Sequence, residues 1–441
     1  MRIQSAFYGL ITLALPTTVL SSCAGESSGR DCSADSRGCE SGSVDQSSQA
    51  LAVPGDDLVV FGDGRSSFDV VNSVGATNSE TTSSASLFNS WASAPGVQRL
   101  TGDFNKDGFM DLALVGGPGW NTIPVAYSQG NGTFLINNIF VGAFGGWANT
   151  SGVKAVVGDF NHDGYSDIAL TGVSGWTQIP VAFSLGTGAF TITQGGSGSF
   201  SSWAATPGAQ VLVGDFNKDG FSDLALTGVS GWTQIPVAFA AGGGSWVVTQ
   251  GGSGSFSSWA AMSGAQVRVG DFNHDGFSDI AVTGHPGWTQ IPVAFASGGG
   301  SWTVTQGGAV NFAAWAGTPG VQVLAGDFNK DGFTDLALTG GPGWNTMPVA
   351  FSIGGGAWQV TNNFVGPFGS WASVSGVRAI AGDFNADGFT DVALTSGAGW
   401  STIPVAFSAG FGTFNVTNNP VGSFAPRAAT SGSTVVAGPV N

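Results

Sequence analysis

The stretch Gly102–Leu114, GDFNKDGFMDLAL, places three aspartates and one asparagine within nine residues. Its first aspartate recurs every 56 residues without an insertion, at Asp103, Asp159, Asp215, Asp271, Asp327 and Asp383. Two tryptophan series keep the same interval: Trp120, Trp176, Trp232, Trp288, Trp344 and Trp400, and Trp91, Trp147, Trp203, Trp259, Trp315 and Trp371. A constant period of this length predicts a stack or ring of equal supersecondary units.

The composition of the 441-residue chain favours β-structure. Charged residues make up 9% and hydrophobic residues 42%, and 73 residues are glycine, a balance typical of short strands joined by tight turns. The formal net charge is −16 and the sequence has no basic cluster, which argues against a nucleic-acid partner.

Each repeat contains four short runs that are typical of strands. In the repeat that holds the second acidic loop these runs are 153–160, 167–173, 177–186 and 188–195, each rich in β-branched and aromatic residues and bounded by Gly or Pro. Four strands in about 40–60 residues are typical of a β-propeller blade. A solenoid is the alternative, but its repeats are usually shorter and its end repeats are caps.

The two ends of the chain complement each other. Residues 433–441, STVVAGPVN, align with a first strand and the start of its loop, with Pro439 in the place of Asp383. Residues 56–64, DDLVVFGDG, match a second strand that has no first strand before it. We therefore predict an all-β fold, a seven-bladed β-propeller over residues 51–441, in which the C-terminal strand completes the first blade and closes the ring.

The acidic loop has the ligand pattern of a calcium site. Positions 1, 3, 5 and 9 are held by Asp103, Asn105, Asp107 and Asp111. Gly108 at position 6 permits a tight turn, and the backbone carbonyl of Phe109 can join the side-chain oxygens. Such hard oxygen ligands select Ca²⁺. A turn without a metal is the alternative, because Asp, Asn and Gly favour turns, but it leaves three carboxylates crowded together without compensation.

The acidic residues of the repeats are confined to these loops. Of the 28 Asp and Glu residues, ten precede residue 81 and the others lie in the six loops. We therefore predict about six calcium ions. The predicted ligands are Asp103, Asn105, Asp107, Phe109 and Asp111; Asp159, Asn161, Asp163, Tyr165 and Asp167; Asp215, Asn217, Asp219, Phe221 and Asp223; Asp271, Asn273, Asp275, Phe277 and Asp279; Asp327, Asn329, Asp331, Phe333 and Asp335; and Asp383, Asn385, Asp387, Phe389 and Asp391.

The segment 323–343, VLAGDFNKDGFTDLALTGGPG, resembles the FG-GAP repeats of the integrin α head and the related repeats of bacterial secreted proteins and fungal integrin-like propeller lectins. The resemblance covers about residues 51–441. It implies that each loop joins the first and second strands of a blade and binds calcium through the positions given above. The first blade departs from the pattern, because Pro439 and Asn441 would face Asp56 and Asp57 across a chain break, so we predict no full site there.

Both tryptophan series are expected at or near the face opposite the acidic loops, since successive loops of a blade alternate between faces. One interpretation is packing between blades. The other is a glycan site, with a ring for stacking and amide and hydroxyl groups for hydrogen bonds, and the resemblance to propeller lectins implies glycan pockets between blades. The candidate residues are Trp120, Trp176, Gln178, Trp232, Gln234, Trp288, Gln290, Trp344 and Trp400. The Trp203 series is assigned to packing.

The sequence offers little support for catalysis, and we predict a protein that is not an enzyme. His162 and His274 stand at position 4 of two acidic loops, where we expect them to be exposed, and His285 is isolated in the motif GHPGW. General acid–base or nucleophilic catalysis requires a paired or activated group, and the repeats contain no such pair.

The N-terminal region is typical of an exported lipoprotein. Residues 1–22 have Arg2, an apolar run and the motif LSSC, which ends at Cys23 and resembles a bacterial lipobox. An ordinary secretory signal is the alternative, and a membrane-spanning helix is disfavoured by the short run and its Pro16. A lipid on Cys23 would be the only membrane contact. Residues 23–50 are predicted to be a flexible Ser/Gly-rich tether, in which Cys32 and Cys39 could form a disulfide outside the cytoplasm.

These patterns together predict an exported recognition or adhesion module at the cell surface. Six similar sites on one disc would give avidity in such recognition. Glycans are the first choice of ligand. The alternative is a protein-binding or structural adhesion module without lectin activity, with cell-surface proteins as partners, and a secreted hydrolase is a minor third. The sequence sets neither the identity of the ligand nor the oligomeric state.

Overall fold

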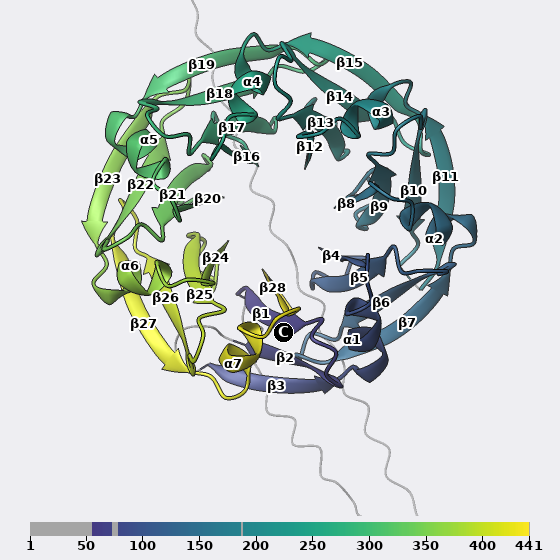
Figure 1. Ribbon diagram of the computed structural model, residues 1–441, viewed down its shortest axis with the longest axis horizontal. Helices are drawn as coiled ribbons and strands as arrows, with labels where there is room; N and C mark the ends of the chain where they lie inside the picture. The colour runs from purple at the N-terminus through teal and green to yellow at the C-terminus, as the bar shows by residue number, and fades with distance from the viewer. Residues whose placement is uncertain (1–54, 73–77, 187, 441) are drawn as a thin grey trace, which may run out of the picture. The chain divides into compact units, whose positions relative to one another are not determined.

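The computed structural model describes residues 55–72, 78–186 and 188–440, and these residues form seven four-stranded antiparallel sheets. The sheets stand as blades around a ring (Figure 1). The prediction of an all-β, seven-bladed β-propeller is therefore confirmed. The predictions for residues 1–50, which include the signal peptide, Cys23 and the tether, lie outside the described residues.

The strands follow the repeat closely. Blade 1 has the order β28 (Thr434–Gly438), β1 (Asp57–Phe61), β2 (Ser67–Asn72) and β3 (Ser79–Ser84). Blades 2 to 4 are β4 (Gln98–Gly102), β5 (Asp111–Val115), β6 (Thr122–Ser128) and β7 (Phe134–Phe140); β8 (Lys154–Gly158), β9 (Asp167–Thr171), β10 (Gln178–Ser184) and β11 (Phe190–Gly196); and β12 (Gln210–Gly214), β13 (Asp223–Thr227), β14 (Gln234–Ala240) and β15 (Trp246–Gly252). Blades 5 to 7 are β16 (Gln266–Gly270), β17 (Asp279–Thr283), β18 (Gln290–Ala296) and β19 (Trp302–Gly308); β20 (Gln322–Gly326), β21 (Asp335–Thr339), β22 (Thr346–Ser352) and β23 (Trp358–Phe364); and β24 (Arg378–Gly382), β25 (Asp391–Thr395), β26 (Thr402–Ser408) and β27 (Phe414–Pro420).

The first blade is completed by the C-terminal strand. β28 pairs antiparallel with β1 in a register that runs from Asp57↔Gly438 to Phe61↔Thr434. The two strands lie side by side at the bottom of the ring in Figure 1, although they come from opposite ends of the chain. The predicted closure is confirmed, and it removes the free sheet edge that an open array would expose.

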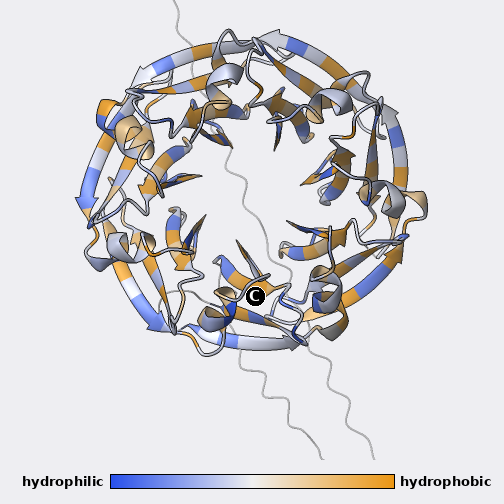
Figure 2. Ribbon diagram, viewed as in Figure 1, coloured by the Kyte–Doolittle hydropathy of each residue, from blue (hydrophilic) through white to orange (hydrophobic). Residues whose placement is uncertain are grey.

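Burial within a blade explains the sequence of each strand. The second strand is mainly apolar between its polar end residues because both of its faces are covered, and β13 (DLALT) is buried over its whole length. The outermost strand alternates between exposed and covered residues, as in β11. Along the rim of the ring, the outermost strands accordingly alternate between hydrophilic and hydrophobic residues (Figure 2).

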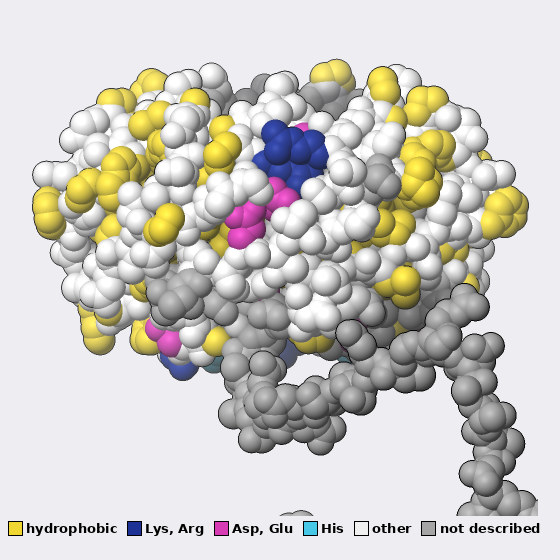
Figure 3. Space-filling model, turned by 90° about the horizontal axis from the view of Figure 1, so that it is seen from below, with side chains coloured by type: hydrophobic (Ala, Val, Ile, Leu, Met, Phe, Trp, Pro, Cys, Tyr) yellow, Lys and Arg dark blue, Asp and Glu magenta, His cyan; other side chains and the backbone are white. Residues whose placement is uncertain are grey.

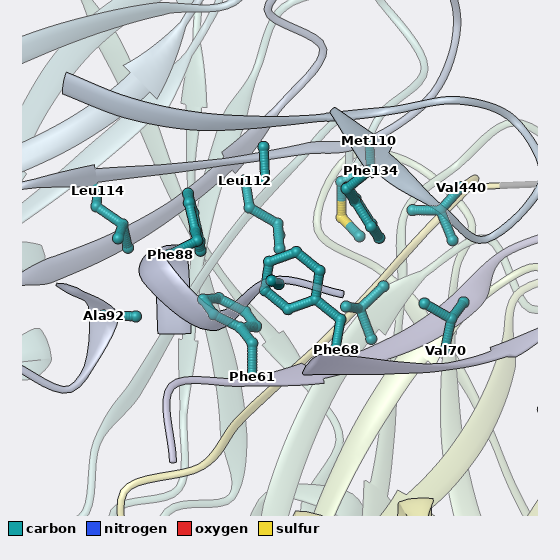
Figure 4. Packing of buried hydrophobic residues seen from close by; sticks show 13 residues of the cluster. Phe61, Phe68, Val70, Phe88, Ala92, Met110, Leu112, Leu114, Phe134 and Val440 are labelled. Atoms are coloured by element: carbon teal, nitrogen blue, oxygen red, sulfur yellow. The ribbon is translucent and has the colours of Figure 1, made fainter. Parts of the chain in front are cut away.

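The hydrophobic core is divided into clusters, each shared by two adjacent blades. Between blades 1 and 2, Phe61 and Phe68 pack with Leu112 and Phe134 (Figure 4). The rings of Phe68 and Phe134 meet edge to face at 5.0 Å between centroids, a favourable aromatic geometry. Because each cluster draws on two blades, a blade cannot bury its apolar faces alone.

Within the described residues, seven short helices lie in the blade-to-blade connections, which the sequence had not indicated as helical. They are α1 (Ser86–Ala92), α2 (Ala143–Ala148), α3 (Phe200–Ala204), α4 (Phe256–Ala260), α5 (Val310–Ala316), α6 (Pro367–Ala372) and α7 (Phe424–Ala428). In α3, Phe200 and Ala204 are both fully buried, and this i, i+4 pair faces the core. One or two turns are too short to show a helical period in sequence. No helix of the described residues has the length and apolarity that a membrane span needs.

Charged side chains hold the closing junction between blade 7 and blade 1. Arg427 of α7, one period after Trp371, is fully buried. Its Nε lies 2.8 Å from Asp63 Oδ2 and its Nη1 lies 3.0 Å from Asp69 Oδ1. Glu80 Oε2 also accepts the backbone N–H of Ser423 at 3.0 Å. The view onto the rim from the side of blade 1 shows a small group of basic and acidic side chains near its centre and a few more at its lower edge, on an otherwise mostly uncharged surface (Figure 3).

Candidate functional site

Each acidic loop joins the first and second strands of a blade and is folded by its own side chains. In the loop between β4 and β5, Gly108 has φ 87°, a conformation that favours glycine. Position 4 also has a positive φ in every loop, at Lys106, His162, Lys218, His274, Lys330 and Ala386. Asp103 Oδ2 accepts the N–H of Gly108 at 2.9 Å, and Asp107 Oδ1 accepts the N–H of Phe109 at 2.9 Å. These bonds direct the carboxylates of positions 1 and 5 toward the interior of the loop.

The aspartate at position 9 is the buried member of each loop. Asp111 is completely buried, and its carboxylate accepts the N–H of Phe104 at 2.9 Å and that of Ser128 at 2.8 Å. Burial is the main cause that raises the pKa of Asp111 to about 8, and the negative charges of Asp107 and Asp103 act in the same direction, while these two hydrogen bonds act to lower it. The same causes raise the pKa to about 8 for Asp167, Asp223, Asp279 and Asp335, and to about 7 for Asp391.

The donor set of the loop suits calcium, although its carboxylates do not already form a metal centre. Among the described residues, no three His, Cys, Asp or Glu side chains converge as metal ligands would. They are held instead by hydrogen bonds, and Asn105 Nδ2 donates to Asp107 Oδ2 at 2.8 Å. All ion pairs of the described residues lie in blade 1 and α7. Within the described residues, the carboxylates of the acidic loops therefore form no ion pair with a basic side chain. Hard oxygen donors around uncompensated negative charge are what Ca²⁺ requires, and the calcium sites stay a prediction.

Neighbouring acidic loops contact one another through position 4. Lys106 Nζ donates to the backbone carbonyl of Asp163 in the next loop at 2.6 Å and lies 5.8 Å from the centre of the Tyr165 ring. His162 is exposed, as expected, but its Nδ1 also donates to the carbonyl of Gly220 at 2.6 Å. The other three contacts of this kind are made by Lys218, His274 and Lys330. Position 4 therefore joins one loop to the next, and only Ala386 is too short to do so.

The seventh position keeps the framework of the loop but lacks the aspartate of position 1. Asp57 takes the place of Asp111, and its Oδ2 accepts the N–H of Val440 at 3.3 Å. Pro439 replaces the aspartate of position 1, yet its carbonyl still accepts the N–H of Met110 at 2.5 Å. The prediction that this blade has no full site rests partly on Asn441, which lies outside the described residues.

The two tryptophan series meet in pockets between adjacent blades. A pocket of about 240 Å³ between blades 3 and 4 is lined by Trp203 from α3 and by Trp232, Thr233, Gln234 and Gln250 from blade 4. Its counterpart between blades 2 and 3 has about 230 Å³, and the one between blades 4 and 5 about 210 Å³. The counterparts are lined by Trp147, Trp176, Thr177, Gln178 and Gln194, and by Trp259, Trp288, Thr289, Gln290 and Gln306.

These pockets contain residues that sequence reasoning missed. It placed Trp176, Trp232 and Trp288 with Gln178, Gln234 and Gln290 in candidate sites, and the structure brings each such pair together. It assigned the Trp203 series to packing alone, whereas Trp147, Trp203 and Trp259 each line a pocket. Gln194, Gln250 and Gln306 were not considered, although the motif TQGG repeats with the same period. That repetition was the available signal, but only strand pairing shows that these glutamines face the pockets.

Each tryptophan of the two series is partly packed against the core and partly exposed to solvent. All twelve tryptophans of the two series are half-buried. Trp203 and Trp232 pack on the core cluster of blades 3 and 4, and Trp120, Trp344 and Trp400 pack on the equivalent clusters of blades 2, 6 and 7. One part of each ring therefore contributes to the core while the remainder is available at the surface.

The three pockets are lined mainly by aromatic, amide and hydroxyl side chains. None of the side chains that line them is charged. His285 lies beside one of these pockets: its Nδ1 donates to the carbonyl of Ser263 at 2.9 Å, and its ring centre lies 5.4 Å from that of Trp288. Two indole rings, amides and a hydroxyl provide apolar contact and neutral hydrogen bonds.

The sequence of the repeats matches a known family. The family of FG-GAP-like repeats matches residues 103–170 and 159–226. No curated protein matches the chain.

Several solved structures are similar to this chain. A lectin from Agrocybe aegerita that recognises non-reducing terminal N-acetylglucosamine is 19% identical, covers 88% of this chain and 96% of its own, and superposes with a TM-score of 0.70. AofleA from Arthrobotrys oligospora is 12% identical over 87% of this chain and 92% of its own, with a TM-score of 0.40. A fungal alcohol oxidase of the AA5 family is 14% identical over 74% of this chain and 65% of its own, with a TM-score of 0.42. At 19% identity the likeness to the Agrocybe aegerita lectin extends to the fold alone.

Proposed function

We propose that this chain, a β-propeller built of FG-GAP-like repeats, is an exported recognition module that binds glycans between its blades and calcium in its acidic loops. The observation that carries the proposal is the set of three equivalent pockets, each lined by two tryptophans and two glutamines. Sugars bind through stacking of their apolar face on aromatic rings and through hydrogen bonds from their hydroxyl groups.

The fold is compatible with this function. The Agrocybe aegerita lectin with the same fold recognises non-reducing terminal N-acetylglucosamine, so a propeller of this architecture can bind glycans. Shallow, repeated sites on one disc bind weakly one at a time, and their number raises the overall affinity for a surface that carries many copies of the sugar.

Calcium is assigned a structural role in this proposal. The acidic loops join the first and second strands of each blade, whereas the pockets lie beside the loops between the second and third strands, at the opposite ends of the same strands. An ion at the loops would neutralise carboxylates and hold neighbouring loops in place, and it would not contact the sugar. Export and lipidation of Cys23 rest on the sequence alone and complete the proposed placement at the cell surface.

A protein ligand is the second candidate, because the face of the ring that carries the uncharged pockets could also bind a protein. It predicts one dominant site and no response to free sugars. A hydrolase is a weaker third candidate, since no charged side chain lines the pockets and general acid–base catalysis needs a positioned proton donor.

The proposal is tested by glycan-array binding of the mature protein, with calcium and with EDTA. We expect binding to a defined family of sugars that is lost when Trp203 or Trp232 and their equivalents are replaced. A folded, calcium-loaded protein that binds no glycan would exclude the lectin function, and surface pull-down would then test the protein-binding alternative.

A further inference from the structure

We infer that the ring carries two kinds of inter-blade site. The three contiguous junctions between blades 2 and 3, 3 and 4, and 4 and 5 form an arc that is specific for an uncharged sugar residue. The other junctions do not take the same ligand. The inference rests on the proposed function and refines it. It predicts three equivalent sites per chain, whereas six complete repeats would suggest six.

The junctions divide by sequence at several positions at once. In blades 3, 4 and 5 the tryptophan is followed by Thr-Gln, and the outermost strand carries Gln-Gly-Gly, as at Trp176-Thr177-Gln178 and Gln194-Gly195-Gly196. In blades 2, 6 and 7 the corresponding motifs are Asn-Thr or Ser-Thr after the tryptophan and Asn-Asn or Asn-Ile in the outermost strand. Because the substitutions occur together in each blade, they alter one site as a unit.

Strand register places these positions on a single face. In blade 3, Gln178 lies opposite Gly196 and Pro180 lies opposite Gln194. Directly opposed residues of antiparallel strands project to the same side of the sheet, as do residues two apart along a strand. Gln178, Pro180 and Gln194 all line the pocket, so a side chain at position 196 would project onto the pocket face as well.

Glycine leaves this face open in the arc. A Cβ atom added to Gly196, or to its equivalents Gly252 and Gly308, would meet no other atom within 4 Å. The backbone therefore does not require glycine for close packing at these positions. The effect of the glycine is that the long amide side chain of Gln178 stands beside open space, where a ligand can reach it.

The other class fills the same position with a bulky residue. Phe140 lies opposite Thr122 in blade 2, and Phe364 lies opposite Thr346 in blade 6. Blade 7 has Pro420 opposite Thr402. The side chains of Phe140 and Phe364 are 71% and 70% exposed, so each stands out from the face instead of packing into the core. These junctions offer a shorter hydroxyl group and an apolar wall where the arc offers an amide and open space.

The chemistry of the arc indicates the class of ligand. Its pockets of about 210 to 240 Å³ suit a single sugar ring better than a larger ligand. No lining side chain is charged, and the chain has a net charge of −16. A sugar acid would lose hydration there without gaining a positive partner, so a neutral residue is favoured. The seventh junction is excluded, because Arg427 stands in the tryptophan position and is paired with Asp63 and Asp69.

The test counts bound sugars on the full mature protein by native mass spectrometry. The probes are the methyl glycosides of glucose, galactose, mannose and N-acetylglucosamine, with glucuronic acid as the charged control. We expect at least one neutral glycoside to bind at three sites of equal affinity and glucuronic acid not to bind. Six equal sites, or equal binding of glucuronic acid, would overturn the inference but leave glycan binding intact. Binding of no probe would overturn glycan binding and the inference with it.

Two variants locate the sites. Gly196→Phe places the bulky residue of the other class into the arc, at an open position where folding is undisturbed, and should reduce the number of sites from three to two. Gly196→Ala is its matched control and should keep three. The transplant Asn345→Thr, Thr346→Gln, Asn362→Gln and Phe364→Gly should create a fourth site in blade 6. An unchanged number of sites in both Gly196→Phe and the transplant would refute the assignment.

Discussion

Asp223 of blade 4 accepts the N–H of Phe216 at 3.0 Å and the N–H of Ala240 at 2.9 Å, so one buried carboxylate joins the acidic loop to the third strand of its blade. Asp219, four residues earlier, accepts the N–H of Phe221 at 3.0 Å within the loop and is exposed. Both aspartates are predicted calcium ligands, yet only Asp223 also holds the fold. At the scale of single residues, the acidic loop therefore contains two kinds of aspartate.

Substitution of these two aspartates should separate their roles. Asp223→Asn replaces one acceptor oxygen with an amide that faces a backbone N–H, so we expect a loss of about 1–3 kcal/mol in the free energy of unfolding. Denaturant unfolding should show this loss both with calcium and with EDTA. Asp219→Asn, the matched control, should lower stability only with calcium. Equal behaviour of the two variants would contradict the distinction.

At the scale of elements, the short helix α3 contributes one residue to the core and another to a pocket at the same junction. Phe200 of α3 anchors the helix in the core between blades 3 and 4, while Trp203, three residues later, lines the pocket. Ser201 Oγ donates to the carbonyl of Gln178 at 2.8 Å, which ties the helix to blade 3. The position of Trp203 over blade 4 is thus set by contacts to both neighbours.

Truncation of the helix tryptophan should affect binding more than folding. Because Trp203 is half-buried, we expect Trp203→Ala to lower the free energy of unfolding by about 2 kcal/mol, less than a fully buried aromatic would. The same variant should remove one glycan site of the arc, as counted by native mass spectrometry. Phe200→Ala serves as the comparison, since it should cost more stability. Retention of all three sites in folded Trp203→Ala would show that the helix contributes packing alone.

At the scale of the whole molecule, the ring depends on one junction unlike the rest. The other junctions place a tryptophan from the connecting helix near the next blade, but α7 places Arg427 against Asp63 and Asp69 of blade 1. A buried ion pair contributes little net stability compared with apolar packing, but loss of one partner leaves buried charge uncompensated. The junction that joins the two ends of the chain is therefore specific for this charge pairing and sensitive to the loss of either partner.

Removal of the buried arginine should open the ring at this junction. Arg427→Met leaves Asp63 and Asp69 without their cation, and we expect a loss of about 3–5 kcal/mol in the free energy of unfolding. Hydrogen exchange should rise first in β28 and β1. A uniform rise over all blades would argue against a junction that opens locally.

Acid should weaken the same junction. Although burial acts to raise it, the hydrogen bonds and charge of Arg427 hold the pKa of Asp63 below its usual value of 3.8. A carboxyl group whose pKa is lowered by folding contributes stability above the pKa of the unfolded chain, and that contribution is lost as the pH falls through the pKa of the folded chain. The unfolding temperature of the protein should thus decrease below about pH 4, and this decrease should be absent from Arg427→Met. The same decrease in the variant would assign it to other carboxyl groups.

Calcium removal should affect the whole ring, because the predicted ions lie in loops that contact one another from blade 2 to blade 7. A ligand that binds only the folded state stabilises it by mass action, so EDTA should lower the unfolding temperature and added calcium should restore it. Calorimetry with calcium and with magnesium provides the comparison. A transition that is indifferent to calcium would exclude the predicted sites.

The sequence by itself determined the repeat, the blade and the closure of the ring. The period of 56 residues and the complementary ends can be recognised along the chain without knowledge of any tertiary contact. It also indicated the acidic loops, since their ligand spacing is local. The tertiary structure decided what lies between blades. Trp203 and Trp232 share a pocket, and Gly196 and Phe140 take equivalent positions, only because strands and helices distant in sequence are brought together. Recognition between blades depends on these non-local contacts, and a repeat pattern read along the chain does not contain them.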